Sequence, residues 1–391
     1  MKRKLTKLVL IAFVSTLLIK CDAMAGWSLI DSGTENPLYS VWGSSPTDVF
    51  AVGPYDIIHY DGSSWTSMDT VGKTGIMDIW GSSENEIFAV GNDSILYYNG
   101  EIWSTMVSRI GVTLWGIWGE LGIGVFAVGD EGTILYYGSW EKMDSGTTEN
   151  LKAVWGSSGN DVFAVGEDII LHYNGTTWEE MNLISGIEHY GFMDVWGSSG
   201  SDVFAVGYGG TILHYDGETW TSMNSGITSD LYGVWGSSGN DVFAVGESGI
   251  IIHYDGSTWS NMEGATVHGL IDVWGTSGSD VYAVGYLGTI LHYDPTQMTT
   301  TTTTDSIITT TTSQQPCPLE QIYGEHSEEA QLLRYFRDEI LTQTSEGQEL
   351  IRLYYQWSPA IVKAMEEDEG FKEDVKEMID GFLPLIRGEA E

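Results

Sequence analysis

One sequence unit, close to VWGSSGNDVFAVG in its clearest copies, recurs seven times along the chain at intervals of 37 to 41 residues. Each unit divides into four short strand-like segments that are separated by turn residues. Four strands in about 40 residues are typical of a propeller blade, so the repeat predicts an all-β seven-bladed β-propeller. The tryptophans that align the units are Trp42, Trp80, Trp118, Trp155, Trp196, Trp235 and Trp274.

A second tryptophan series marks the fourth strand of each unit, and its first member, Trp27, has no complete unit before it. The last unit ends at Asp294 after only three strands. We therefore expect residues 27–30 to supply the outer strand of the last blade, because a closed ring leaves no exposed edge for aggregation. A β-solenoid is the alternative, but it does not explain why the chain starts one strand in and stops one strand short.

Residues 1–25 have the pattern of a secretory signal peptide: a basic start, an apolar stretch, and Ala23-Met24-Ala25 before Gly26. The propeller is predicted to occupy residues 26–297. The apolar stretch is shorter than the roughly 20 residues that a membrane helix needs, and no later one is longer, so no transmembrane segment is expected. The pattern predicts a secreted or extracytoplasmic protein, and association with the cell surface is left open.

Residues 298–316 are rich in threonine, a composition that buries no core and predicts an extended linker. Residues 317–391 carry apolar residues at helical spacing, which predicts a small all-α C-terminal domain. This tail resembles the CFI-box domain of secreted bacterial proteins, although Pro318-Leu319-Glu320 replaces the Phe-Ile-Ala of the box. The resemblance implies a module that docks to a cell-surface partner. It rests on Cys317, Tyr323-Gly324, Leu333-Arg334, Phe336-Arg337-Asp338, Gly347, Tyr354-Tyr355 and Ser358-Pro359.

The chain is strongly acidic, with a formal net charge of −39. Such a surface repels nucleic acid and anionic membranes, so both are poor partners and no nucleic-acid partner is predicted. Cationic partners or divalent ions fit it better. A soluble extracellular surface explains the same charge without any ligand.

The turn before each outer-strand tryptophan resembles the Asp-box of the bacterial neuraminidase repeat, as in Asp255, Gly256, Thr258 and Trp259. Here Asp and Gly are adjacent, whereas the family separates them by one residue. The resemblance implies a propeller fold in which this turn is structural and lies opposite the ligand-binding face. Sialidase chemistry needs several arginines around a substrate carboxylate, and Arg109 is the only arginine of the propeller segment. That activity is therefore excluded, and we predict no catalytic residue.

The loops on the face opposite these turns are the predicted ligand-binding region. The distance from an outer-strand tryptophan to the next inner-strand tryptophan is 15 residues except between Trp178 and Trp196, where it is 18. The longer loop carries Glu188, His189 and Tyr190. Other variable residues of this face follow the AVG segment and complete the predicted set: Glu167, Tyr208, Glu247 and Tyr286.

Three aspartates, Asp78, Asp194 and Asp272, open inner strands near the expected central channel. Oxygen-rich sites of this kind bind calcium, so these residues form a candidate cation site. No other cofactor is predicted.

These features favour an exported, non-catalytic binding scaffold whose loops recognise a glycan or an extracellular protein. The alternatives are a propeller-type carbohydrate hydrolase or lyase and a purely structural surface protein. A pair of acids with strongly shifted pKa values inside the channel would favour the enzyme. A wide channel mouth lined by Tyr and Glu would favour binding, and a flat polar face would favour the structural role.

Overall fold

The computed structural model describes residues 26–70, 72, 75–120, 124–138, 140–181, 191–262 and 266–295. Residues 25–298 form one compact unit. The predicted signal peptide, threonine-rich linker and all-α C-terminal domain lie outside the described residues.

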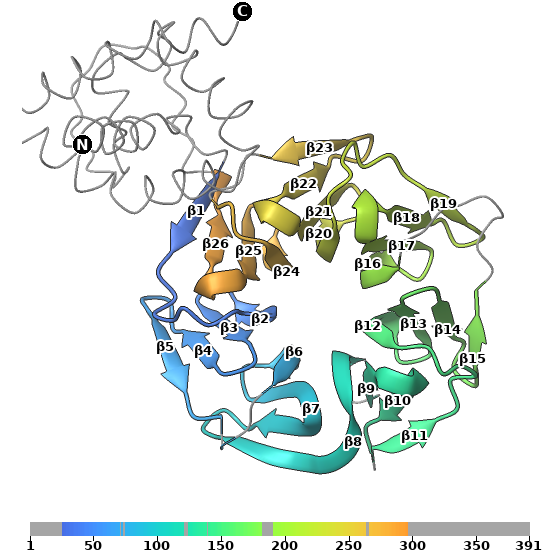
Figure 1. The fold of residues 1–391 in the computed structure, drawn as a ribbon, viewed down its shortest axis with the longest axis horizontal. Coiled ribbons are helices and arrows are strands. Elements are labelled where there is room, and N and C mark those ends of the chain that lie inside the picture. The colour runs from blue at the N-terminus through green and yellow to red at the C-terminus, as the bar shows by residue number, and fades with distance from the viewer. Residues whose placement is uncertain are drawn as a thin grey trace, which may run out of the picture. The chain divides into compact units, whose positions relative to one another are not determined.

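The described strands form antiparallel sheets arranged around a ring, each with the strand that begins a sequence repeat nearest the centre (Figure 1). Five sheets have four strands. In ring order they are β2 (Ser40–Ser45), β3 (Asp48–Val52), β4 (Ile57–Tyr60) and β5 (Trp65–Met68); β12 (Leu151–Ser158), β13 (Asp161–Gly166), β14 (Ile170–Tyr173) and β15 (Trp178–Glu180); β16 (Phe192–Ser199), β17 (Asp202–Gly207), β18 (Ile212–Tyr215) and β19 (Trp220–Ser222); β20 (Leu231–Ser238), β21 (Asp241–Gly246), β22 (Ile251–Tyr254) and β23 (Trp259–Met262); and β24 (Leu270–Ser277), β25 (Asp280–Gly285), β26 (Ile290–Tyr293) and β1 (Trp27–Ile30).

The sixth sheet has six strands and contains two sequence repeats. Its strands are β6 (Ile76–Ser83), β7 (Glu86–Tyr98), β8 (Trp103–Glu120), β9 (Gly124–Gly129), β10 (Thr133–Tyr136) and β11 (Glu141–Met143).

The prediction of seven separate blades is therefore wrong, because the described residues form six sheets. The reason lies in β7 and β8, which run on through segments that the repeat pattern assigns to loops. Asn92 pairs with Thr113 and Ser94 pairs with Ser108, so the ladder between the two strands continues past the end of the second repeat. Strand β8 then pairs with β9, and this joins the second and third repeats into one sheet.

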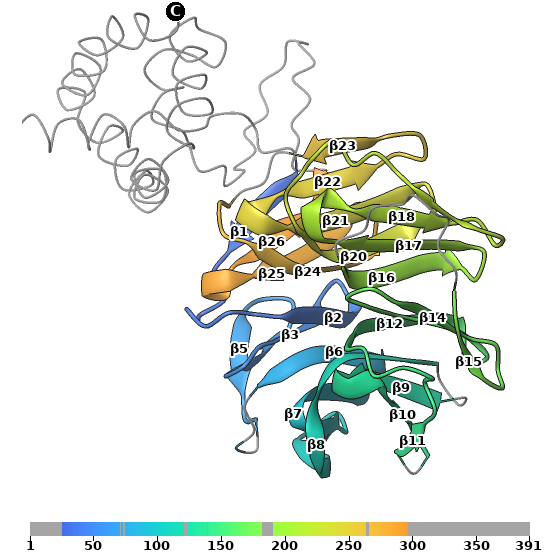
Figure 2. The same cartoon turned by 45° about the vertical axis from the view of Figure 1, so that its right-hand side comes forward.

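Strand β1 closes the ring by pairing with β26, with Trp27 opposite Tyr293 and Ile30 opposite Ile290. The first strand of the array thus completes the last sheet, which agrees with the closure expected from the two incomplete ends. The other outer strands, among them β5, β11 and β15, lie at the periphery (Figures 1 and 2). A ring of sheets also excludes the β-solenoid alternative.

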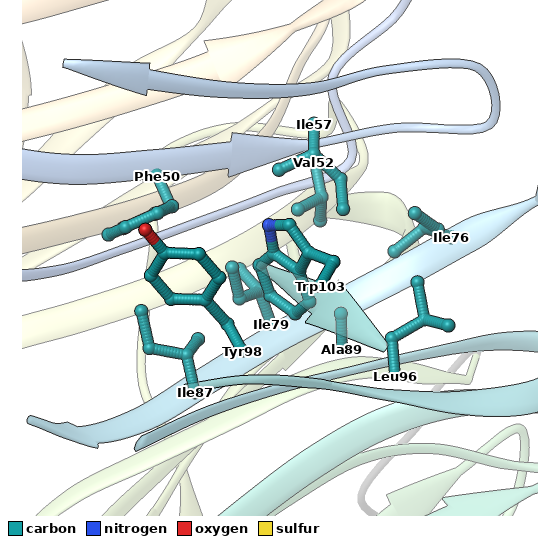
Figure 3. Close-up of a cluster of buried hydrophobic side chains, with 10 residues drawn as sticks. All are labelled: Phe50, Val52, Ile57, Ile76, Ile79, Ile87, Ala89, Leu96, Tyr98 and Trp103. Carbon is teal, nitrogen blue, oxygen red and sulfur yellow. The ribbon is translucent and has the colours of Figure 1, made fainter. Parts of the chain in front are cut away.

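The core lies between neighbouring sheets. Figure 3 shows the cluster in which Phe50, Val52 and Ile57 of the first repeat pack against β6, β7 and Trp103 of β8. At the closure, Leu38 and Val41 share a cluster with residues of the last repeat. Each fully buried side chain of this size contributes about 1.5–3 kcal/mol, so interfaces between sheets hold the ring together.

The glycine that follows each inner-strand tryptophan explains how closely the sheets approach. A methyl group added at Gly197 would lie 2.7 Å from the Trp155 ring, and one added at Gly43 would lie 2.7 Å from Trp274. The same contact repeats in order around the ring, and Trp274 against Gly43 is the step that closes it. Any larger residue at these positions would push two sheets apart.

Candidate binding pocket of the propeller

A cavity of about 430 Å³ lies where the inner strands begin, and residues from every repeat line it. Each inner strand, or the segment just before it, contributes the residue that stands three positions before the repeated tryptophan. These seven residues are Tyr39, Met77, Trp115, Lys152, Met193, Tyr232 and Ile271. At this repeat position the lining is therefore aromatic and apolar, with one lysine.

Two of the predicted ligand-binding residues, Tyr208 and Tyr286, lie at this pocket. They begin the short 3₁₀ turns η2 (Tyr208–Gly210) and η4 (Tyr286–Gly288). The turns are fixed to the loops beside them, because the Tyr208 N–H donates to the Gly191 carbonyl at 3.1 Å and the Tyr286 N–H donates to the Gly269 carbonyl at 3.0 Å. Both rings stay accessible, with 36% and 48% of the residue surface exposed.

The other predicted ligand-binding residues lie elsewhere. Glu167 and Glu247 are exposed on the same face but do not line the cavity. Glu188, His189 and Tyr190 lie outside the described residues.

Four tyrosines gather on one side of the pocket: Tyr39, Tyr208, Tyr232 and Tyr286. Burial raises the pKa of Tyr232 to about 12, with further contributions from Asp230, Glu247 and the phenols of Tyr286 and Tyr208. Burial also raises the pKa of Tyr39, and Tyr286 and Tyr55 add to the effect. All of these interactions place Tyr286 near both Tyr39 and Tyr232. The phenols of Tyr39 and Tyr232 are therefore neutral at physiological pH, and both residues line the cavity.

The opposite side of the pocket carries a lysine over an aromatic ring. The Lys152 ammonium lies 4.2 Å from the centre of the Trp115 ring. The Trp115 indole N–H donates to the Asp130 carboxylate at 2.7 Å, which fixes the ring. Among the described residues Lys152 forms no ion pair. The cation is stabilised by the electron-rich face of the indole.

The three predicted metal ligands line the cavity, and each joins two neighbouring inner strands. Asp272 of β24 accepts hydrogen bonds from the N–H of Val273 at 2.7 Å and from the N–H of Val41 at 2.9 Å. Asp194 forms the same two bonds to Val195 and Val234.

Asp78 repeats the pattern with Ile79 and Ile117, and it also accepts from the Ser40 hydroxyl at 2.6 Å. At this repeat position the next inner strand carries a glycine, Gly116 after Asp78 and Gly233 after Asp194. A methyl group added at Gly116 would lie 2.9 Å from the Cα atom of Ala153, and one added at Gly233 would lie 2.8 Å from that of Asp272, so the glycines allow the following inner strand to approach closely.

Burial raises the pKa of all three carboxyl groups. The pKa of Asp78 rises to about 6, and that of Asp272 rises to about 7 with a further contribution from the Asp78 charge. The pKa of Asp194 is also raised, first by burial and then by Asp272. Within the described ranges, no group of three or more Asp, Glu, His or Cys is arranged to hold a metal ion. The structure thus gives the predicted calcium site no support.

Sequence reasoning missed the residues three positions before each repeated tryptophan. Their signal is variation, since Tyr, Met, Trp, Lys and Ile occupy a position that lies shortly before a nearly constant segment of Val or Ile, Trp and Gly. A position that varies within a constant repeat is free of the packing that fixes the rest, and here it faces the cavity.

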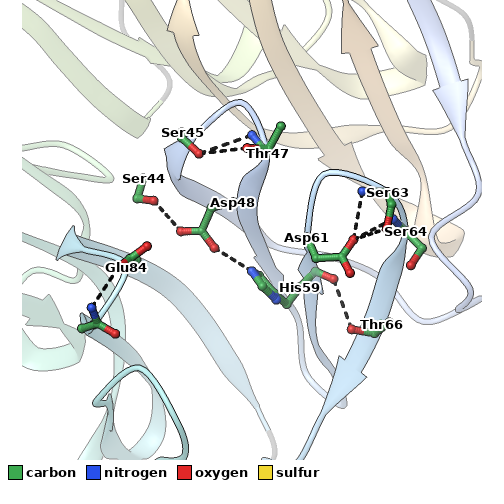
Figure 4. Close-up of polar contacts among 11 residues, drawn as sticks. Ser44, Ser45, Thr47, Asp48, His59, Asp61, Ser63, Ser64, Thr66 and Glu84 are labelled. Atoms are coloured by element: carbon green, nitrogen blue, oxygen red, sulfur yellow. Dashed lines mark hydrogen bonds and ion pairs between the residues drawn. The ribbon is translucent and has the colours of Figure 1, made fainter.

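The opposite face carries a repeated chain of polar contacts, shown for the first repeat in Figure 4. The Ser44 hydroxyl donates to the Asp48 carboxylate, whose other oxygen lies 2.7 Å from His59 Nε2. The same arrangement of hydroxyl, carboxylate and imidazole occurs in four more repeats, at Asp161, Asp202, Asp241 and Asp280, with Thr276 in place of serine in the last.

The carboxylate is the middle group of these three hydrogen-bonded side chains. A serine nucleophile needs the imidazole next to its hydroxyl, because the imidazole must take the hydroxyl proton. In the chain of Ser44, Asp48 and His59 the serine instead contacts the carboxylate, so the arrangement fixes a turn and does not activate a nucleophile.

No protein-family model matches the chain, and no curated protein matches its sequence. The propeller is similar to the solved structure of YCF48 from Cyanidioschyzon merolae (TM-score 0.57, 14% identity, 70% of this chain and 100% of that chain). It is similar to YCF48 bound to D1 peptide (TM-score 0.57, 16% identity, 71% and 98%) and to the WD40 propeller domain of Doa1 (TM-score 0.55, 15% identity, 68% and 95%). At these identities the likeness shows a shared propeller fold. Within the part of the chain that the structure describes, no helix has the length and apolar character to span a membrane.

Proposed function

We propose that this protein is a non-catalytic binding scaffold that recognises an exposed segment of another protein in the pocket where its inner strands begin. The single observation that carries the proposal is the 430 Å³ cavity with accessible aromatic rings at its mouth. Rigid aromatic side chains bury a large contact area at low entropic cost, which makes them frequent anchors in protein recognition.

Exposed apolar residues continue from the pocket onto the surrounding turns. Tyr55 is 62% exposed beside Tyr39, and Leu287 is 58% exposed next to Tyr286. A peptide that enters the cavity with one side chain would therefore find further apolar contacts outside it. A solved propeller of the same fold, YCF48, was captured with a D1 peptide, which gives a precedent for this use of the fold.

This proposal of a protein segment as the ligand is narrower than the expectation from the sequence, which was a glycan or a protein. Aromatic rings also suit sugars, but of the three similar structures named above the one with a bound partner holds a peptide. The signal-like residues 1–25 support export of the protein, and we include an extracytoplasmic location in the proposal.

The test is binding of the full chain to an array of random 12-residue peptides, compared with a Tyr208→Ala/Tyr286→Ala variant. We expect selected peptides to lose at least tenfold in affinity for the variant. Ile102→Ala is the matched control, because Ile102 is 64% exposed at an outer turn, and its substitution should leave binding unchanged. Failure of every peptide to bind, equal binding by the double variant, or binding to a glycan array instead would overturn the proposal.

A carbohydrate hydrolase is the second candidate, because Asp194 and Asp272 form a pair of acids with raised pKa values at the cavity. Against this role, each carboxyl group accepts main-chain N–H bonds on both of its oxygens, which accounts for its presence structurally. An enzyme would release reducing sugar from a polysaccharide panel and would lose that activity in Asp194→Asn. We expect no release by the native chain.

A further inference from the structure

We infer that the tyrosine side of the pocket binds a cationic group, such as the ammonium of a lysine or methylated lysine on the partner segment. This inference rests on the proposed function for the identity of the partner, but its chemistry is argued from the pocket alone. The residues that carry it are Tyr39, Tyr208, Tyr232 and Tyr286, which we call the tyrosine cluster.

All four residues of the tyrosine cluster line one cavity, and they come from repeats one, five, six and seven, which follow one another in the closed ring. A guest in this part of the cavity therefore meets several aromatic side chains at once. Aromatic faces carry partial negative charge, and a cation within about 6 Å of several faces is attracted to all of them. Quaternary ammonium groups bind in sites of this construction.

The charges around the tyrosine cluster also favour a cation. Asp230 and Glu247 lie close enough to Tyr232 to raise the pKa of its phenol. The lining of the cavity contains three further carboxyl groups and one lysine. The whole chain has a net charge of −39, which raises the local concentration of cationic partners and repels anionic ones.

Lys152 shows that this pocket stabilises an ammonium without an ion pair. Its Nζ lies 4.2 Å from the Trp115 ring, on repeats three and four, while the tyrosine cluster belongs to repeats one, five, six and seven. One aromatic wall thus already holds a cation of the protein itself. The tyrosine cluster has more aromatic side chains, and among the described residues the cation found over an aromatic ring is Lys152 over Trp115, not over a tyrosine of the cluster.

An anionic guest is the competing possibility, since Lys152 would attract it. The two possibilities give opposite responses to Lys152→Met. Removing a like charge strengthens the binding of a cation, whereas removing the only cation of the pocket weakens the binding of an anion.

The experiment compares choline with 3,3-dimethylbutan-1-ol, which has the same shape without the charge, by titration against the full chain. We expect choline to bind at least fivefold more tightly than the alcohol. Tyr232→Ala should abolish this preference, and Tyr232→Phe should retain most of it, because the ring face and not the hydroxyl attracts the cation. Lys152→Met should tighten choline binding about twofold or more.

Equal affinity for the two probes, or weaker choline binding by Lys152→Met, would overturn the inference. The result is separate from that of the peptide array. Peptides that bind while choline shows no preference would refute the cation site alone, and choline preference without any peptide binding would refute the proposed partner alone.

Discussion

The Asp272 carboxylate accepts a hydrogen bond of 2.9 Å from the backbone N–H of Val41, a residue 231 positions earlier in the chain. This bond joins the inner strand of the last sheet to that of the first. The ring is therefore closed in two ways, by this hydrogen bond and by the pairing of β1 with β26. One side chain of the pocket therefore also holds the ring.

We expect Asp272→Ala to lower the free energy of unfolding by about 1–3 kcal/mol, because it leaves the N–H groups of Val41 and Val273 without their acceptor. Urea unfolding followed by circular dichroism measures this loss. Asp144→Ala is the matched control, since Asp144 accepts the N–H of Gly146 in an exposed local turn and its loss should cost less. An equal effect of the two variants would refute a role for Asp272 in closure.

The glycine after each inner-strand tryptophan should not tolerate a methyl group. In Gly197→Ala the added carbon would lie 2.7 Å from the Trp155 ring and 2.8 Å from the Asp202 carbonyl oxygen, which predicts a loss of about 1–3 kcal/mol. Gly146→Ala separates packing from backbone strain, because Gly146 has a φ of +72° but no atom near the new methyl group. A larger loss at Gly146 than at Gly197, measured by thermal unfolding, would contradict the packing argument.

The histidine and aspartate of the polar chain on the opposite face should be replaceable, as a pair, by the tyrosine and glycine that occupy the same positions in the third repeat. There Tyr136 replaces histidine and Gly124 replaces aspartate, and a methyl group at Gly124 would lie 2.4 Å from the Tyr136 ring. We therefore expect His253→Tyr to destabilise the protein because the larger ring meets Asp241.

Adding Asp241→Gly should recover part of that loss, so the double variant should be about 1 kcal/mol more stable than the sum of the single effects. A double-mutant cycle from urea unfolding gives this coupling. Strict additivity would show that the tyrosine and the glycine of the third repeat are independent.

The affinity for a cationic guest should rise between pH 5.5 and pH 8. Burial raises the pKa of Asp78 to about 6 and that of Asp272 to about 7, so both carboxyl groups lose a proton in this interval. Each ionisation adds negative charge to the cavity, and the attraction for a cation increases. Choline titrations at the two pH values test this, with 3,3-dimethylbutan-1-ol as the control whose affinity should not change. A choline affinity that stays constant or falls as the pH rises would contradict the predicted direction of this pH dependence.

The repeat was sufficient to predict the propeller and its closing strand, because blade length and the two incomplete ends are properties of the sequence. The number of sheets could not be predicted in this way. The second and third repeats share one sheet because Asn92 pairs with Thr113 across a segment that the sequence pattern assigns to a loop. Tyr208 and Tyr286 were found as variable positions after a constant strand. The contact of Lys152 with Trp115 joins two repeats in space, and a pattern read within one repeat does not contain it.

Hydrogen–deuterium exchange of the full chain, with and without a peptide selected on the array, tests the central claim most directly. The account predicts protection of residues 206–212 and 284–289, which carry the turns of Tyr208 and Tyr286, and none at residues 61–64 or 255–258 on the opposite face. Protection confined to the opposite face or to the outer strands would show that the pocket is not the recognition site.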